Sequence, residues 1–176
     1  MKIDIPHPDD IEKLGTQITI HKWDTWSMDH TLAYIIVPML KQLKETKNGA
    51  PLVENSDVPE ELHMPADWYD AKFNKNGETD ENFFKRWDWV LDEMLFAFES
   101  KLINWEDQFS SGEIDRIMVP VDKEGNEVPK DEAEYFRWDQ GPNDTYKVDW
   151  DGRNAYQERI TNGFRLFGKY YESLWD

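Results

Sequence analysis

The sequence predicts an α+β fold with a mainly helical core of three long helices and a small antiparallel β-hairpin or sheet. Three stretches repeat apolar residues with the period of an α-helix, near residues 27–47, 80–102 and 151–174. Residues 114–150 change to short alternating runs separated by turn residues, which is typical of β-strands. The 176 residues suit one domain with a sizeable core, so we expect a single domain over residues 1–176.

The first predicted helix follows a cluster of aromatic and polar residues, 23–30. A polar N-terminal arm over residues 1–15 and a strand over 17–21 precede this cluster. Ser27 is a natural N-cap because its hydroxyl can accept from first-turn amides, and Asp29 falls where the helix dipole favours a carboxylate. One face of the helix is apolar and predicted to be buried: Leu32, Ile35, Ile36, Met39, Leu40 and Leu43. The cluster is therefore expected at the mouth of a buried helix.

A long connection over residues 50–79 follows the first helix. It carries three prolines, and an Asn-Gly turn lies near its end. Loops of this length are uncommon in compact domains and are either functional lids or mobile segments. Within it, residues 58–62 predict one short helical turn with Pro59 at the first position.

The second predicted helix, residues 80–102, has the broadest apolar surface in the chain. Seven apolar side chains share one face: Phe84, Trp87, Leu91, Met94, Leu95, Phe98 and Leu102. Phe83 and Val90 widen that face. A helix with so wide an apolar surface packs on more than one side, so we expect it at the centre of the core.

The β-type region over residues 114–150 is expected to form a β-appendage to that core. Ile117, Val119 and Val121 alternate with other residues along the chain, and residues 122–126 predict a turn. Residues 134–138 can then pair back on the first strand. The pattern therefore indicates an antiparallel hairpin or a small sheet.

The third predicted helix begins at Asp151 as N-cap and ends near residue 174. Its predicted buried stripe is Tyr156, Ile160, Phe164, Phe167 and Tyr171. Gly163 and Gly168 interrupt the helix, and each costs up to ~1 kcal/mol relative to alanine. Such a cost indicates close contact with another backbone, as in a tight helix crossing, or with a ligand.

The composition excludes several classes of function. Twenty Lys and Arg against 37 Asp and Glu give a formal charge of −17, so we expect no nucleic-acid partner. The absence of cysteine removes disulfides, thiol nucleophiles and thiolate metal sites. The longest apolar stretch is too short to cross a bilayer and no signal peptide is present, which predicts no membrane partner and a cytoplasmic protein. The sequence leaves homo-oligomer formation open.

Five blocks of the sequence are long and specific. The opening block is Trp-Asp-Thr-Trp-Ser-Met-Asp-His at residues 23–30, and the last is Gln-Glu-Arg-Ile-Thr-Asn-Gly-Phe-Arg-Leu-Phe-Gly-Lys-Tyr-Tyr at residues 157–171. Between them lie blocks at residues 38–47, 57–62 and 85–94. Together these blocks resemble a family of uncharacterised tailed-bacteriophage proteins. The resemblance covers most of the chain and implies a phage origin, hence the cytoplasm of the host cell.

The third helix is basic within an acidic chain. Its cations are Arg153, Arg159, Arg165 and Lys169, against Glu158 alone between residues 152 and 171. Arginine binds phosphate in bidentate fashion and tryptophan stacks on nucleobases, but the cations can equally pair with carboxylates elsewhere in the chain. Ten residues form the candidate ligand site: Trp23, Trp26, Ser27, His30, Arg86, Trp87, Arg159, Asn162, Arg165 and Lys169.

Established catalytic motifs are missing from the sequence. It has no phosphate-binding glycine loop, no nucleophile elbow, no zinc-binding His-Glu motif and no dinucleotide fingerprint. A binding role without a cofactor is therefore favoured, and enzymatic activity is left open. An alternative site for Mg²⁺ or Mn²⁺ would use four carboxylates that can also cap a helix or pair with cations: Asp29, Asp88, Asp92 and Glu93.

These features predict a phage protein that binds and sequesters a small anionic, nucleotide-type ligand. By analogy with its phage origin, the ligand would be a nucleotide signal of host immunity. One alternative is a divalent-metal-dependent phosphohydrolase acting on a nucleotide. Another is an acidic interaction protein that blocks a host factor.

Overall fold

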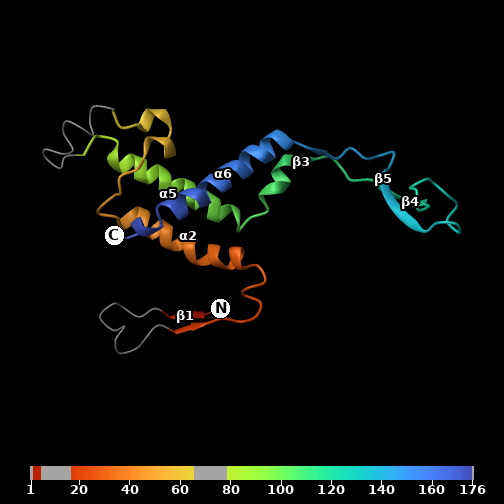
Figure 1. Ribbon diagram of the computed structural model, residues 1–176, viewed down its shortest axis with the longest axis horizontal. Helices are drawn as coiled ribbons and strands as arrows, with labels where there is room; N and C mark the ends of the chain where they lie inside the picture. The colour runs from red at the N-terminus through yellow and green to blue at the C-terminus, as the bar shows by residue number, and fades with distance from the viewer. Residues whose placement is uncertain (1, 5–16, 66–78, 176) are drawn as a thin grey trace. The chain divides into compact units, whose positions relative to one another are not determined.

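The computed structural model describes residues 2–4, 17–65 and 79–175 (Figure 1). Within these residues it contains three α-helices, α2 (Met28–Thr46), α5 (Phe83–Ser100) and α6 (Trp150–Lys169), and three two-stranded antiparallel sheets. The predicted α+β fold with a helical core is thereby confirmed. Among the described helices, none is both long and apolar enough to cross a bilayer.

The chain divides into two compact units. One comprises residues 1–103 and 158–176, and the other comprises residues 104–157. The predicted β-appendage over residues 114–150 falls inside the second unit, whereas α6 begins in that unit and continues in the first.

The first unit is built around α5, as its broad apolar face predicted. Ten of its residues are buried, among them Trp87, Leu91 and Met94. α2 packs on α5 through Ala33, Val37 and Leu40, and Figure 1 shows α6 crossing α5. Phe84 is the exception to the predicted stripe, because it lies in the first turn of α5 and is exposed.

Gly163 allows α6 to approach the backbone of α5. A Cβ at this position would overlap the carbonyl oxygen of Glu93 and lie 2.6 Å from the Cβ of Ala97. The glycine is therefore explained by a tight helix crossing, one of the two explanations that the sequence left open. At Gly168 no described atom outside its own stretch of helix lies within 4 Å of a Cβ position, so a close contact with another backbone is wrong there.

The start of α6 differs from the prediction by two residues. Asp149 accepts a hydrogen bond on Oδ1 from the amide of Gly152 at 3.0 Å, so this side chain caps the helix. Asp151, the predicted N-cap, lies inside the first turn. α6 ends at Lys169, and a 3₁₀ turn, η5 (Tyr171–Ser173), follows it instead of continued α-helix.

The loop after α2 is described as far as residue 65. It contains two 3₁₀ turns, η2 (Asn55–Asp57) and η3 (Glu60–Leu62), and the second confirms the helical turn predicted over residues 58–62. Val53 and Val58 of this loop are buried in the core of the first unit. The remainder of the predicted lid, residues 66–78, lies outside the described residues.

Two short strands precede α2. β1 (Lys2–Asp4) pairs with β2 (Gln17–Thr19), so the predicted strand over residues 17–21 is present but shorter. The part of the predicted arm over residues 5–15 lies outside the described residues.

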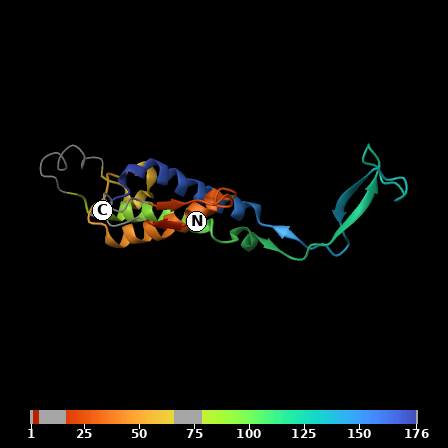
Figure 2. The same cartoon turned by 90° about the horizontal axis from the view of Figure 1, so that it is seen from below.

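The second unit is a β-ribbon with short flanking elements. β4 (Arg116–Val121) and β5 (Tyr135–Gln140) form the predicted antiparallel hairpin, which Figure 2 shows as a twisted ribbon. β3 (Ser110–Ser111) pairs with β6 (Lys147–Val148), and η4 (Trp105–Phe109) precedes them. In the predicted turn, Gly125 has a φ of +87°, and the Asp122 carboxylate accepts from the amides of Glu124 and Asn126.

Candidate functional site

The cations at the C-terminal end of α6 are paired with carboxylates of the loop after α2. Asp57 is buried and accepts from Arg165 at 2.7 Å, from Lys169 at 2.5 Å and from the hydroxyl of Tyr170 at 2.7 Å. Lys169 also pairs with Glu54 at 2.7 Å. These contacts attach the loop to the helix, and they neutralise two residues of the candidate ligand site.

Opposing effects set the pKa values in this network. Burial raises the pKa of Asp57, but the hydrogen bonds from Lys169, Tyr170 and Arg165 outweigh it and bring the pKa below its ordinary value. The hydrogen bond from Lys169 to Asp57 raises the pKa of the lysine. Burial, together with the hydrogen bond to Asp57, raises the pKa of Tyr170 to about 12. Asp57 is thus ionised and Tyr170 protonated at neutral pH.

Arg159 and Asn162 also contact protein groups. Arg159 binds both carboxylate oxygens of buried Glu93, with its shortest contact at 2.7 Å, and its guanidinium lies 3.7 Å from the ring centre of Phe96. Asn162 accepts two hydrogen bonds from Arg165, at 2.9 and 3.0 Å. The fourth cation of α6, Arg153, pairs with Glu106 inside the second unit. The excess positive charge of α6 is therefore balanced by carboxylates distant in sequence.

Arg86 and Trp87 are buried inside the first unit. The guanidinium of Arg86 donates to both oxygens of Asp80 and to the carbonyl of Leu62. Burial raises the pKa of Asp80, but the hydrogen bonds from Arg86 and from the amide of Asn82 lower it below the ordinary value. Trp87 packs edge-on against Tyr170 and is 1% exposed, so neither face of its ring is open to a base.

The candidate residues just before α2 are exposed, whereas His30 lies in its first turn and is half-buried. Trp26 is 81% exposed and its ring centre is 6.0 Å from that of Trp23, which is also exposed. Ser27 occupies the N-cap position, but its side chain makes no capping hydrogen bond, contrary to the prediction. His30 contacts the ring of Tyr34. Within the described part of the chain, no contact joins these four candidate residues to the paired cations of α6.

The four carboxylates of the alternative metal site are each paired with a different cation. The pairs are Asp29 with Lys101, Asp88 with Lys47, Asp92 with Lys44, and Glu93 with Arg159. Within the described residues, no three His, Asp or Glu side chains come together in a way that could hold a metal ion. The structure therefore does not bring Asp29, Asp88, Asp92 and Glu93 into one cluster.

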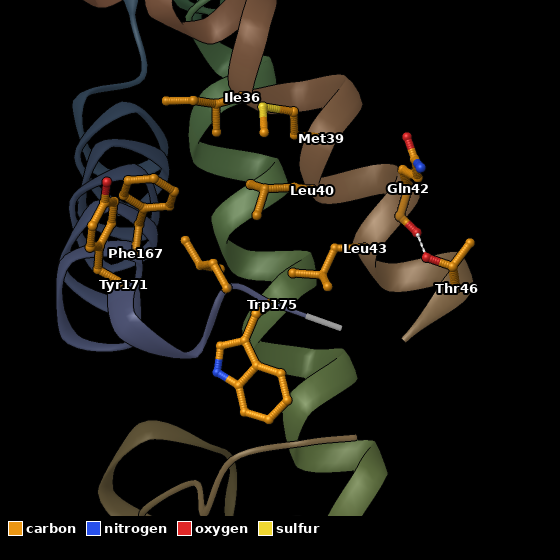
Figure 3. A pocket seen from close by; sticks show the side chains of 10 residues that line it. Ile36, Met39, Leu40, Gln42, Leu43, Thr46, Phe167, Tyr171 and Trp175 are labelled. Carbon is orange, nitrogen blue, oxygen red and sulfur yellow. Dashed lines mark hydrogen bonds between the residues drawn. The ribbon is translucent and has the colours of Figure 1, made fainter. Parts of the chain in front are cut away.

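A groove of about 770 Å³ lies in the first unit between α2 and the C-terminal segment (Figure 3). Its lining is mostly apolar and aromatic: Ile36, Met39, Leu40, Gln42, Leu43, Thr46, Phe167, Tyr171, Leu174 and Trp175. This volume is in the range of small-molecule sites, which are typically apolar with a few polar groups.

The groove combines three aromatic rings with a few polar side-chain groups. Phe167 and Tyr171 project from α6 and η5, and Trp175 lies at one end of the groove (Figure 3). The polar side-chain groups of the lining are the amide of Gln42, the hydroxyls of Thr46 and Tyr171 and the indole N–H of Trp175. The Thr46 hydroxyl donates to the backbone carbonyl of Gln42 at 2.9 Å. Such a lining can stack on a flat ring and can hydrogen-bond to polar atoms on the edge of that ring.

Sequence reasoning missed this groove although its residues were visible. Met39 and Tyr171 were predicted to be buried, yet they are 61% and 65% exposed. Phe167, Tyr171 and Trp175 are spaced four residues apart, which places aromatic side chains on one side of a helical segment. That spacing is the signal in the sequence that points to the groove. It does not identify a groove by itself, because three aromatic residues at helical spacing usually form core.

The chain matches no family model, no curated protein and no solved structure. The resemblance to tailed-bacteriophage proteins therefore stays a prediction.

Proposed function

We propose that the protein binds a small nucleotide-type ligand and inserts its aromatic base into the groove between α2 and the C-terminal segment. The observation that carries this proposal is the lining of the groove, with Phe167, Tyr171 and Trp175 around a volume of about 770 Å³. Trp175 is 69% exposed, so its ring has a face available for stacking. A stacked base contributes roughly 1–3 kcal/mol, and burial of its edge against the apolar lining adds to that.

The charge of the groove limits which part of the ligand it holds. Its lining includes no Lys, Arg or His, whereas Arg165 and Lys169 of α6 are engaged by Asp57. The phosphate groups of the ligand would therefore remain in solvent, and the base and sugar would supply the binding energy. This binding mode differs from the one predicted from the sequence, in which the cations of α6 bind the phosphate groups of the ligand.

Sequestration is the role that this arrangement supports. The four carboxylates of the metal alternative are each neutralised by a cation, so we do not propose a phosphohydrolase. A ligand held by stacking is released chemically unchanged. Together with the resemblance to phage proteins, this supports withholding a nucleotide signal from its host receptor, which is a step by analogy.

A ligand panel tests the proposal. Purified protein is heated with free bases, nucleosides, linear and cyclic nucleotides and inorganic phosphates, and bound molecules are recovered and weighed by mass spectrometry. We expect base-containing compounds to raise the melting temperature and to be recovered intact, because saturation at about 100 times Kd stabilises the fold by about 2.7 kcal/mol. A shift with inorganic phosphates alone, a cleaved ligand, or no shift with any compound would contradict the proposal.

A further inference from the structure

One face of the β4–β5 hairpin in the second unit carries a continuous group of apolar side chains. In its antiparallel register Met118 lies opposite Trp138, and Pro120 lies opposite Phe136. Because side chains alternate across a strand, these four residues share a face. Met118, Phe136 and Trp138 are 52%, 48% and 66% exposed. The face therefore presents two aromatic rings, a thioether and a proline to solvent.

The opposite face mixes apolar residues with the polar contacts of the hairpin. Arg137 donates to Asp139 at 2.7 and 2.8 Å and to the carbonyl of Gly125 at 3.0 Å, and it lies 3.4 Å from Glu127. Val121 is buried on this side. Ile117 and Tyr135 also lie on this side and are 46% and 57% exposed, but Arg137 and Asp139 interrupt its apolar surface. The face with Phe136 and Trp138 is therefore the more continuous apolar surface of the hairpin.

A hairpin of two strands is stable in water only when its apolar face packs on something. Isolated two-stranded hairpins are marginal, and contiguous exposed apolar patches commonly mark interaction sites. In the described part of the chain, the sheet that contains Met118 and Trp138 has two strands. Burial of two aromatic side chains by a partner would remove that apolar area from water and supply binding energy.

The net charge of the second unit indicates what kind of partner surface would complement it. Residues 104–157 contain fourteen Asp and Glu against six Lys and Arg, a net charge of −8. This charge repels nucleic acid, anionic membrane surfaces and a second copy of the same unit. A protein surface with an apolar centre and a rim of Lys and Arg complements it, and such a rim increases the rate of association.

We propose that the face formed by Met118, Pro120, Phe136 and Trp138 docks on a partner protein whose contact surface is apolar at its centre and basic at its rim. This proposal is independent of the groove in the first unit, because it concerns other residues and another class of ligand.

Two matched double variants of the full chain test the proposal. The face variant combines Phe136→Thr with Trp138→Thr and removes the aromatic side chains of the proposed docking face. The control variant combines Ile117→Thr with Tyr135→Thr and removes similar side chains from the opposite face of the same strands. Threonine keeps a high β-propensity in both variants. Circular dichroism checks that each variant is folded, and Trp138→Glu serves as a second variant that leaves Phe136 in place.

The probe is a random displayed-peptide library selected on the wild-type protein. We expect enriched peptides that combine apolar residues with Lys and Arg, and whose affinity falls at least about tenfold for the face variant and for Trp138→Glu. The control variant should bind them within about twofold, and binding should weaken as salt rises from about 50 to about 300 mM.

Three results would overturn the proposal. The first is selection that enriches no peptide, or enriches peptides without basic residues. The second is equal binding to the face and control variants. The third is self-association of the wild type, measured by analytical ultracentrifugation, that becomes stronger at high salt and is lost in the face variant. The occupant of the face would then be a second copy of the chain.

Discussion

Arg165 on α6 binds the buried carboxylate of Asp57 at 2.7 Å, across a separation of more than one hundred residues in the sequence. Lys169 and Tyr170 bind the same carboxylate. Arg165 was expected to contact a ligand anion, but its partner is a protein carboxylate. The contact fixes the loop after α2 to the end of α6. That end of α6 is close in sequence to the aromatic residues that line the groove.

Removal of Asp57 should cost more stability than removal of Arg165. Asp57→Ala leaves the hydroxyl of Tyr170 and two cations without their shared acceptor, and we expect a loss of about 3 kcal/mol. Arg165→Ala leaves Asp57 its other two donors, and Arg165 is half exposed, so the loss should be about 1 kcal/mol. Urea unfolding measures both values. The reverse order would show that Asp57 is not the centre of the network.

Acid should weaken the contribution of Asp57. Its pKa is lowered in the folded state from the ordinary value of 3.8, so the unfolded chain binds the proton more tightly. The stabilisation is therefore complete above about pH 5 and is lost as the pH falls below about 4, through the folded-state pKa. The difference in unfolding free energy between wild type and Asp57→Asn should accordingly shrink at pH 3. A difference that stays constant with pH would contradict this sign.

The two glycines of α6 should respond to alanine in opposite directions. Gly163→Ala places a methyl group against the carbonyl of Glu93, so we expect a loss of about 1–3 kcal/mol from overpacking. Gly168→Ala meets no described atom within 4 Å and should stabilise the fold by up to about 1 kcal/mol through helix propensity. Thermal unfolding of the two variants is a matched comparison, and equal effects would be inconsistent with the crossing at Gly163.

Arg86 should act as a structural residue. Arg86→Met strands the buried carboxylate of Asp80 and should cost about 3–5 kcal/mol, and the additional change Asp80→Asn should recover part of that loss. A double-mutant cycle by urea unfolding gives the coupling energy. If Arg86→Met leaves stability unchanged and instead weakens ligand binding, Arg86 returns to the ligand site.

Local patterns predicted the helices and the hairpin because period and turn residues act over a few positions. The core face of α5 and the turn at Asp122 followed from neighbouring residues in the sequence. The site could not be predicted in this way. For the cations of α6 the sequence left a ligand site and carboxylate pairing equally open, because the carboxylate partners lie far away, Glu93 at 66 and Glu54 at 115 positions from Arg159 and Lys169. The same limit hid the groove, which forms only when residues near the C-terminus meet α2.

The central claim is that a base-containing ligand binds in the groove through Trp175, and two tryptophan variants test it directly. Isothermal titration with the strongest compound from the ligand panel compares the wild type with Trp175→Ala and with Trp26→Ala, an exposed tryptophan outside the groove. We predict that Trp175→Ala weakens binding by roughly 1–3 kcal/mol, about five-fold to over a hundred-fold in Kd, and that Trp26→Ala binds like the wild type. Loss of binding in Trp26→Ala with unchanged binding in Trp175→Ala would contradict the account and return the site to the residues before α2.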